Sequence, residues 1–432
     1  MENVVLEKNA SQVVEDKMLK YKKKKNIELY KSYRVFSFDL LFYYAIIYLF
    51  LSIEKGLTTA QILQFDAFYI LFKSCVQIPS TIIIQKIGKR KSIVFASIIL
   101  AIHMLFIIFA PNFNILLVSQ FLCALGYTIK ATCETDMLYD SIEHGEKRGS
   151  TFAKIDGKAT ARHYYIEAIS AVIAGFLFVV NSYIPIVLSF LVLMWVAIIS
   201  TKFEEIEVKQ QKVRMSEQFR NLKYSFRNIF HSKRLISLLV FNCLMVSMIK
   251  IMQNLRNTVL LEIGMPEKYF GLIFAVLGII SGIATKNQDR IHKRYRNKTL
   301  TFLAFPTAIS CLLLGIFLMF DINVRIIFPI VLILFTVQYT TKGPYYVLIK
   351  RYLNNFTNGE KRVKIATVNN LIENLVVSIL IFGASSILNV LPIDIALIII
   401  GGISTIGVVI VLDKMRYTVG LKPDEYSKKE IL

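Results

Sequence analysis

Runs of about 20 apolar residues recur along nearly the whole chain and are separated by short polar segments. A helix needs about 20 residues to cross roughly 30 Å of hydrocarbon. The strict alternation of apolar and polar residues that a membrane β-barrel requires is absent, so helices satisfy the backbone in lipid. The pattern therefore predicts an all-α integral membrane protein with twelve transmembrane helices. They cover residues 33–54, 60–85, 91–110, 113–140, 155–180, 184–203, 235–262, 268–287, 299–320, 326–350, 363–388 and 393–412.

Lysine and arginine cluster in the segments between the apolar runs. The chain has 432 residues, 51 Lys and Arg, and a formal net charge of +21. With the N-terminus placed in the cytoplasm, 43 of the 51 basic residues fall on the cytoplasmic side and three on the opposite side. This asymmetry follows the positive-inside rule, so we expect a multi-pass plasma-membrane protein with both termini cytoplasmic. Because the charge lies in short loops and not on a soluble face, we expect no nucleic-acid binding.

The longest connection, residues 204–234, divides the chain into two halves of six predicted spans each. Gly-Glu-Lys-Arg occurs at residues 145–148, after the fourth span, and again at 359–362, after the tenth. Its occurrence at equivalent positions indicates an internal duplication. The predicted organisation is a cytoplasmic N-terminal segment (1–32), an N-terminal six-helix bundle (33–203), a cytoplasmic linker (204–234), a C-terminal six-helix bundle (235–412) and a cytoplasmic tail (413–432).

Residues 81–91, between the second and third spans, read Thr-Ile-Ile-Ile-Gln-Lys-Ile-Gly-Lys-Arg-Lys. With the 6+6 plan, this stretch resembles the major facilitator superfamily of secondary transporters, whose pattern here is close to Gly-x-Leu-x-Asp-Arg-x-Gly-Arg-Arg/Lys. Gly88 and the basic cluster match, whereas Thr81 and Gln85 replace the first glycine and the aspartate. The corresponding loop of the second half keeps Asp289-Arg290 without the glycine.

The resemblance implies a cytoplasmic gate in these two loops. A glycine lets the chain turn tightly, and cations there can pair with acids or helix C-termini in one conformation only. Membrane anchoring by positive charge alone is the alternative. The predicted gate residues are Gln85, Lys86, Gly88, Lys89, Arg90, Asp289 and Arg290. Signatures of proton-driven drug exporters in the fourth and fifth spans are missing apart from Gly126 and Gly175, which weakens that specific assignment.

Charged side chains inside the predicted spans need partners or a wet cavity, because a charge at mid-bilayer costs about 2.5–3.5 kcal/mol. The resemblance implies that spans 1, 4, 7 and 10 line a central cavity. Six of the charged residues on those spans are the predicted substrate-binding residues: Asp39, Lys130, Glu134, Lys250, Arg256 and Lys342. Lys130 and Glu134 are four residues apart and can instead neutralise each other on one helix face.

The C-terminal half has an excess of positive charge at depth, with Glu373 as its one mid-span acid against three bases. Either acids of the N-terminal half or an anionic group on the substrate balances this excess. Glu167 and Glu373 are also candidates for proton coupling, since buried carboxylates can carry protons. A hydrogen-bonded structural acid is the alternative for each.

The pattern is not typical of an enzyme or a metalloprotein. The five cysteines lie inside apolar runs without metal-ligand spacing, and the five histidines are scattered, so no metal or cofactor site is predicted. The predicted function is a secondary transporter that moves a small organic solute with an anionic group by alternating access; proton-coupled export is a hypothesis within this prediction. A flippase for an anionic lipid and a polytopic membrane transferase are the alternatives. We expect a monomer whose partners are membrane lipid, the small-molecule substrate and protons.

Overall fold

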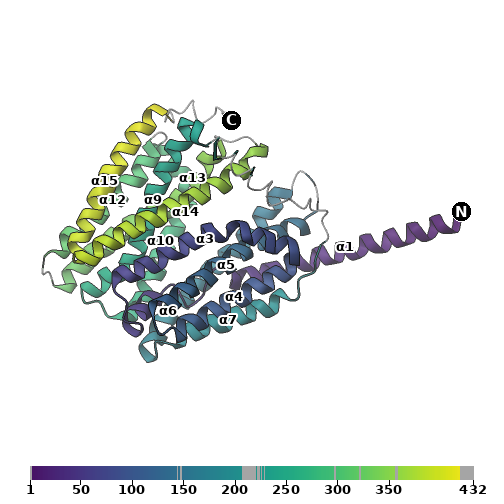
Figure 1. Cartoon of the computed structure of the whole chain (residues 1–432), viewed down its shortest axis with the longest axis horizontal. Coiled ribbons are helices and arrows are strands. Elements are labelled where there is room, and N and C mark those ends of the chain that lie inside the picture. The colour runs from purple at the N-terminus through teal and green to yellow at the C-terminus, as the bar shows by residue number, and fades with distance from the viewer. Residues whose placement is uncertain are drawn as a thin grey trace. The chain divides into compact units, whose positions relative to one another are not determined.

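The computed structural model describes residues 2–143, 145, 148–206, 220, 224, 226, 227, 229–295, 298–320, 323–355 and 359–418, and no strand occurs among them (Figure 1). The helices are α1 (Glu2–Ser37), α2 (Ile47–Leu49), the π-helix η1 (Phe50–Glu54), α3 (Thr59–Ile87), α4 (Lys89–Phe109), α5 (Phe113–Ser141), α6 (Arg148–Val180), α7 (Ile184–Ser200), α9 (Lys233–Glu262), the 3-10 helix η2 (Glu267–Tyr269), α10 (Phe270–Lys286), α11 (Gln288–Tyr295), α12 (Thr299–Leu318), α13 (Val324–Asn355), α14 (Gly359–Val390) and α15 (Ile393–Thr418).

Eleven of the predicted spans correspond to helices of the structure. Ten helices in the described part of the chain are long and apolar enough to cross a membrane, and α7 is a shorter apolar helix of 17 residues. Their ends differ from the predicted ones by several residues; α15, for example, continues to Thr418 instead of ending at residue 412. The first predicted span is interrupted, so the count of twelve continuous helices is not confirmed.

The interruption lies between the end of α1 at Ser37 and the start of α2 at Ile47. Residues 38–46 form bends and turns, and Phe42 has a φ of 64°. Bulky side chains rarely adopt this left-handed conformation, so the surrounding structure must hold it in place. The chain therefore enters the predicted first span as a helix, unwinds, and resumes as two short helical pieces.

Carbonyl groups released by the interruption meet donors from other helices. The ends of a helix leave several carbonyl groups without an intrahelical partner. The Ser189 hydroxyl of α7 donates to the Leu41 carbonyl at 2.6 Å, and the Lys130 ammonium of α5 donates to the Ser37 carbonyl. These contacts allow irregular backbone inside a membrane, where water cannot satisfy it.

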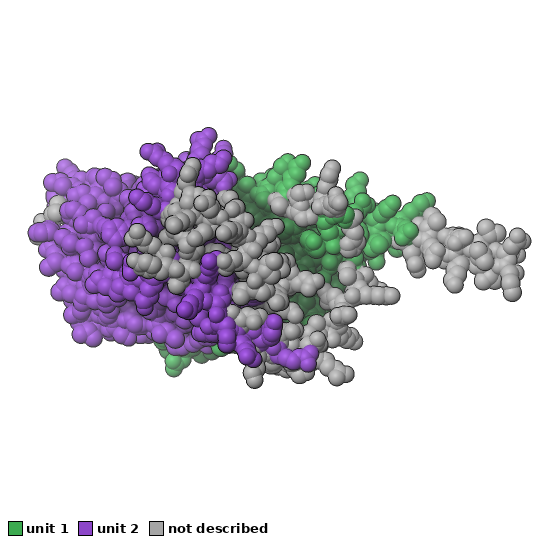
Figure 2. All heavy atoms as spheres, turned by 90° about the horizontal axis from the view of Figure 1, so that it is seen from above, with its two compact units in different colours: residues 1–44, 75–171, 181–212 green, residues 45–74, 172–180, 213–432 purple. Residues whose placement is uncertain are grey.

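Contacts divide the chain into two compact units, shown in Figure 2. Unit 1 comprises residues 1–44, 75–171 and 181–212, and unit 2 comprises residues 45–74, 172–180 and 213–432. Each unit contains most of one predicted half. Two segments of the first half, 45–74 and 172–180, nevertheless belong to unit 2, and the division into two six-helix bundles stays a prediction.

In unit 1, α4 packs against α5 and α7, and α1 packs against the same two helices. Tyr33 and Phe203 are fully buried there and meet edge to face, with ring centroids 5.2 Å apart. Gly126 brings α5 close to α4, because a Cβ at this position would lie 2.7 Å from Leu100 Cγ. The N-terminal part of α1 extends beyond the ends of the other helices of this unit (Figure 1).

In unit 2, α12 packs against α13 and α15, while α9 packs against α14 and α15. The helices α12 and α15 approach most closely at two glycines. A Cβ at Gly315 would lie 2.6 Å from the Asp394 carbonyl oxygen, and one at Gly401 would lie 2.5 Å from the Leu312 nitrogen. Small residues let helix backbones touch in this way, which is how helices associate in a membrane.

Gly401→Ala is expected to lower the unfolding temperature of the detergent-purified protein, because the added methyl group meets the Leu312 backbone. Overpacking of this kind costs about 1–3 kcal/mol. Gly402→Ala is the matched control, since a Cβ there has only Leu312 Cδ1 within reach, at 3.8 Å. Equal losses of stability in the two variants would contradict the close approach of α12 and α15.

Candidate functional site

Glu134 of α5 lies at the centre of a buried polar cluster in unit 1 and is 1% exposed. It accepts hydrogen bonds from the Tyr33 hydroxyl at 2.7 Å and the Ser37 hydroxyl at 3.0 Å, and it forms an ion pair with Arg34. All three donors lie in the last turns of α1. A single carboxylate thus holds the end of this helix, with charge and donors replacing the water that burial removes.

Lys130, one turn earlier on α5, is 2% exposed and donates to the Ser37 carbonyl. The spacing of Lys130 and Glu134 allowed an ion pair between them, but their charged atoms do not lie within 4.0 Å of each other. A cation at the C-terminal end of a helix is favoured by the helix dipole, so Lys130 caps α1. Glu134 pairs with Arg34 instead.

Asp39 lies within the interruption of the first span. Its Oδ1 accepts a hydrogen bond from the Tyr127 hydroxyl at 2.6 Å and one from the Leu40 amide at 3.0 Å. The Lys130 ammonium lies 4.5 Å from the centroid of the Tyr127 ring. The structure therefore brings the three predicted residues of unit 1 together around the interruption, through a tyrosine that the sequence analysis did not select.

Arg34, at the start of the first predicted span, is not among the predicted site residues. Besides Glu134, its Nε lies 3.2 Å from Asp156 Oδ1 of α6, which also accepts a hydrogen bond from the Tyr30 hydroxyl at 2.6 Å. Burial raises the pKa of Tyr30, so the phenol stays protonated as a donor. The sequence did contain a feature that could have identified Arg34, because residues 30, 33, 34 and 37 are polar and share one face of a helix.

Glu167 of α6 has a histidine neighbour. Its side chain is 34% exposed, and its Oε2 lies 3.8 Å from His163 Nε2 one turn earlier. His163 is fully buried, and its Nδ1 lies 2.7 Å from the Val35 carbonyl oxygen of α1. The spacing of four residues between His163 and Glu167 was a signal that could have linked them.

Arg256 of α9 is buried in unit 2 and is 4% exposed. No carboxylate among the described residues lies within ion-pair distance of it, and its Nε and Nη1 atoms have no hydrogen-bond partner there. Its guanidinium carbon lies 3.1 Å from the centroid of the Phe274 ring on α10 and 5.4 Å from that of Tyr339 on α13. Two other buried atoms of α9 and α13, Asn257 Oδ1 and Gln338 Nε2, also have no partner among the described residues.

Lys342 and Lys250 are half-buried on α13 and α9. The Lys342 ammonium lies 5.4 Å from the Tyr339 ring, so Lys342 and Arg256 share an aromatic neighbour. The Lys250 carbonyl accepts a hydrogen bond from Asn254 at 3.1 Å. The predicted substrate-binding residues thus divide between the units: Asp39, Lys130 and Glu134 lie in unit 1, and Lys250, Arg256 and Lys342 lie in unit 2.

Two polar contacts within unit 2 join α9 to segments of the first half. Asn254 Nδ2 donates to Asp66 Oδ2 at 3.0 Å. The Thr258 hydroxyl donates to the Tyr48 hydroxyl, which also lies 3.0 Å from Thr59 Oγ1. Asn254 and Thr258 flank Arg256 by two residues on either side, so these contacts lie within one turn of it.

Glu373 of α14 accepts a hydrogen bond from Asn242 Nδ2 at 2.6 Å. The Tyr345 hydroxyl donates to Asn242 Oδ1 at 2.8 Å, which fixes the orientation of the amide. Glu373 therefore ends a short chain of hydrogen bonds across α13, α9 and α14. Among the described residues, no group of three or more His, Cys, Asp or Glu side chains is placed to hold a metal ion.

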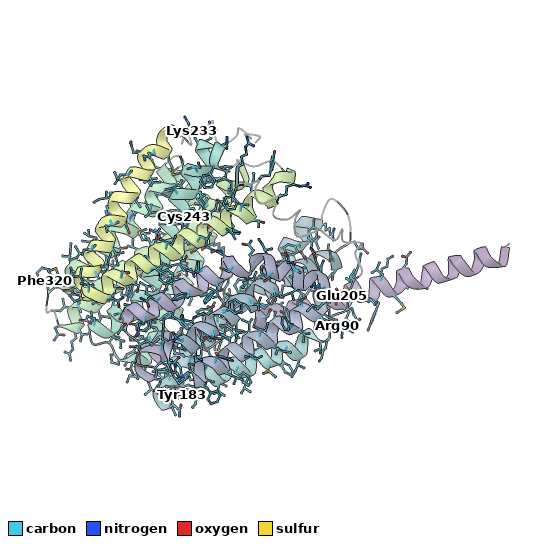
Figure 3. The ribbon with its side chains drawn as sticks, viewed as in Figure 1. Arg90, Tyr183, Glu205, Lys233, Cys243 and Phe320 are labelled. Carbon is cyan, nitrogen blue, oxygen red and sulfur yellow. The ribbon has the colours of Figure 1, made fainter. Side chains whose placement is uncertain are left out.

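The predicted gate loop of unit 1 turns at Gly88, whose φ is 84°. Glu205 accepts hydrogen bonds from the Lys89 amide at 2.9 Å and the Arg90 amide at 2.8 Å, and so caps the N-terminus of α4. Arg90 also donates to the Thr201 carbonyl at 2.6 Å. Figure 3 shows Arg90 and Glu205 side by side.

Among the predicted gate residues that the structure describes in unit 1, Lys89 is the one that lies near two carboxylates. Its ammonium lies 2.5 Å from Asp140 and 3.8 Å from Asp136, both on α5. The remaining members are exposed: Gln85, Lys86, Asp289 and Arg290. The gate function of the whole set stays a prediction, and Glu205 is the partner that sequence reasoning missed.

A family profile described as Major Facilitator Superfamily matches residues 34–380 of the chain. A comparison with curated proteins found no match. The solved structures that resemble this fold include the nucleoside transporter NupG, with a TM-score of 0.73 and 10% identity over 92% of this chain and 99% of that one.

Two crystal structures of POT family transporters are also similar. One, in complex with a thioalcohol conjugated peptide, has a TM-score of 0.67 and 12% identity, covering 93% of this chain and 96% of that one. The other, in complex with 5-aminolevulinic acid, has a TM-score of 0.67 and 11% identity, covering 94% and 96%. At these identities the likeness concerns the fold.

Glu134→Gln is expected to lower the free energy of unfolding by about 3 kcal/mol, because removing one partner of a buried ion pair leaves the other uncompensated. Denaturant or thermal unfolding in detergent measures this loss. Glu28→Gln is the control, since Glu28 forms an exposed pair with Lys31 at 2.7 Å, and no change in unfolding temperature is expected. If the Glu134→Gln protein were as stable as the parent, the cluster would have no structural role.

Proposed function

The chain belongs to the Major Facilitator Superfamily, and on that premise we propose that it carries a small organic solute with an anionic group by alternating access, with Arg256 binding that group. The family and the structural neighbours make the protein a multi-pass membrane transporter and not an enzyme. The anionic group and its contact with Arg256 go beyond what the family establishes, and the isolation of the Arg256 guanidinium supports them.

A buried cation without an acid is costly, and the surroundings of Arg256 offset only part of the cost. Cation–π contacts with Phe274 and Tyr339 contribute about 2 kcal/mol or more when desolvated. The unsatisfied Nε and Nη1 atoms still lack acceptors. A planar guanidinium presents paired N–H groups that match a carboxylate or phosphate, so an anionic group on the solute would supply these acceptors.

The buried cations of the two units differ in the partners that they contact. Lys130 in unit 1 is engaged by the Ser37 carbonyl, and Arg34 by Glu134 and Asp156. An anion arriving at either one would have to displace an existing partner. Arg256 has no such carboxylate or carbonyl partner among the described residues, which favours unit 2 for the anion contact.

The position of Arg256 on α9 suggests how binding would be coupled to movement. The hydrogen bonds from Asn254 to Asp66 and from Thr258 to Tyr48 hold α9 against segments of the first half of the chain. A solute that draws the Arg256 side chain toward itself would shift the same turn of α9 and weaken both contacts. Alternating access requires contacts of this kind, present in one state and absent in another.

Proton coupling is proposed for Glu373, with Glu167 as the second candidate. Glu373 lies at the end of the hydrogen-bond chain through Asn242 and Tyr345, where gain of a proton would change an acceptor into a donor.

The excess of basic residues on one side of the predicted spans supports cytoplasmic termini in a plasma membrane.

Arg256→Gln is expected to raise the KM for an anionic solute at least tenfold in proteoliposomes, because a charge-assisted hydrogen bond contributes about 1.5–3 kcal/mol. A panel of labelled anionic, neutral and cationic solutes, together with a fluorescent anionic lipid, identifies the substrate class. Arg325→Gln is the matched control, since it removes an equal charge from an exposed position on α13. Unchanged transport by Arg256→Gln for every solute carried would refute the assignment.

Glu373→Gln is expected to abolish accumulation driven by an imposed pH gradient while leaving downhill exchange of the same solute measurable, because glutamine cannot exchange a proton. Glu262→Gln, at the exposed end of α9, is the control and should retain gradient-driven uptake. Full gradient-driven accumulation by Glu373→Gln would exclude this carboxylate as the proton carrier and move the test to Glu167→Gln.

A further inference from the structure

We propose that a groove in unit 1, between α1 and the connection from α5 to α6, binds a doubly charged phosphate group. The groove encloses about 540 Å³ and is lined by cationic side chains from both of its walls. Its described lining residues are Lys20, Lys23, Lys24, Ile27, Glu28, Ser141, Ile142, Glu143, Gly145, Arg148 and Thr151, and none of them belongs to the buried clusters around Glu134 and Arg256. The proposal is therefore independent of the function proposed above.

One wall of the groove is a row of lysines on α1. Lys20, Lys23 and Lys24 are spaced at i, i+3 and i+4, so they lie on one face of the helix and turn three ammonium groups to the same side. None of them lies within ion-pair distance of a carboxylate among the described residues. Two acids, Glu28 and Glu143, also line the groove. Glu28 forms an ion pair at 2.7 Å with Lys31, which is not a lining residue.

The opposite wall is the first turn of α6. Arg148, which begins this helix, and Thr151, one turn later, both line the groove. The first amide groups of a helix have no intrahelical acceptor and bear partial positive charge, which favours phosphate at this end. The Arg148 amide itself donates to the Gly145 carbonyl at 3.1 Å.

The Arg148 side chain is held in place before any ligand arrives. Its Nε and Nη2 donate to the Tyr139 carbonyl at 3.0 and 2.6 Å, and the guanidinium stacks on the Tyr139 ring at 3.9 Å. Asp140 lies 3.9 Å away and balances part of its charge. The lysines of α1 therefore supply most of the excess positive charge, and the fixed wall of α6 supplies the geometry.

A phosphomonoester matches this arrangement better than a carboxylate or a monovalent anion. It carries nearly two charges at neutral pH and three acceptor oxygens, enough to meet the lysines of α1 while it lies at the positive end of the α6 dipole. The groove has room for the group to which the phosphate is attached. A lipid headgroup and a soluble phosphorylated molecule share this chemistry, so the experiment has to separate the two sources.

The experiment measures binding to the full-length protein in neutral detergent by thermophoresis, with dioctanoyl phosphatidic acid as the lipid probe and inorganic pyrophosphate as the soluble probe. Dioctanoyl phosphatidylcholine is the uncharged comparison. We expect at least one phosphate probe to bind, with an affinity that falls as salt rises, because Lys20 and Lys24 are exposed and Lys23 is only half-buried. Binding of phosphatidic acid alone identifies a membrane lipid as the ligand; binding of pyrophosphate as well identifies the phosphate itself.

Two double variants test whether the groove is the site. Lys23→Gln with Lys24→Gln removes two charges from the groove and is expected to weaken binding about tenfold, as two exposed ionic contacts would. Lys17→Gln with Lys22→Gln removes two charges from the same helix outside the lining and should change affinity less than twofold. Absence of binding by both phosphate probes, or equal losses in the two variants, would overturn the proposal.

Discussion

A carbonyl group that leaves a helix inside a membrane must find a donor, and the interruption between α1 and α2 is organised around this requirement. Water and lipid supply no donor at this depth, so other helices do: Lys130 meets the Ser37 carbonyl and Ser189 meets the Leu41 carbonyl. Because the Lys130 ammonium is engaged in this way, Glu134 is left to Arg34 and to two hydroxyl groups of α1. The buried cluster of unit 1 thus follows from one break in one helix.

The two units treat buried charge differently. In unit 1 each of the buried charged groups described here has a partner, and the partners lie on α1, α5 and α6. In unit 2 Arg256 is enclosed by Phe274 and Tyr339 and meets no carboxylate among the described residues. A satisfied ionic cluster stabilises one arrangement of its helices, whereas an unsatisfied cation is ready for a ligand that brings the missing acceptors. This difference is the basis for the proposal that the unit 1 cluster is structural and that Arg256 binds the solute.

Hydropathy predicted the spans after the first because each is a single helix with an uninterrupted apolar run. It could not predict the break at residues 38–46, since Phe38 to Ile46 contains neither glycine nor proline and the cause lies in contacts from other helices. The spacing of Lys130 and Glu134 showed only that the two could pair with each other. It could not show that each has a partner on α1 about a hundred residues away, Arg34 for Glu134 and the Ser37 carbonyl for Lys130. Sequence alone makes Arg256 a candidate, because a charge in an apolar run is rare, whereas the aromatic rings around it come from α10 and α13 and are identified only by the fold.

The continuity of α1 gives the chain a mechanical connection between its N-terminal lysines and the interior of unit 1. Lys24 and Ser37 belong to the same helix, thirteen residues or about 20 Å apart. A helix of this length rotates and tilts as a stiff rod, so displacement of its basic end moves the capped end by a comparable amount. A ligand that displaces Lys20, Lys23 or Lys24 would therefore also displace the end of α1 that the Lys130 ammonium caps at the Ser37 carbonyl.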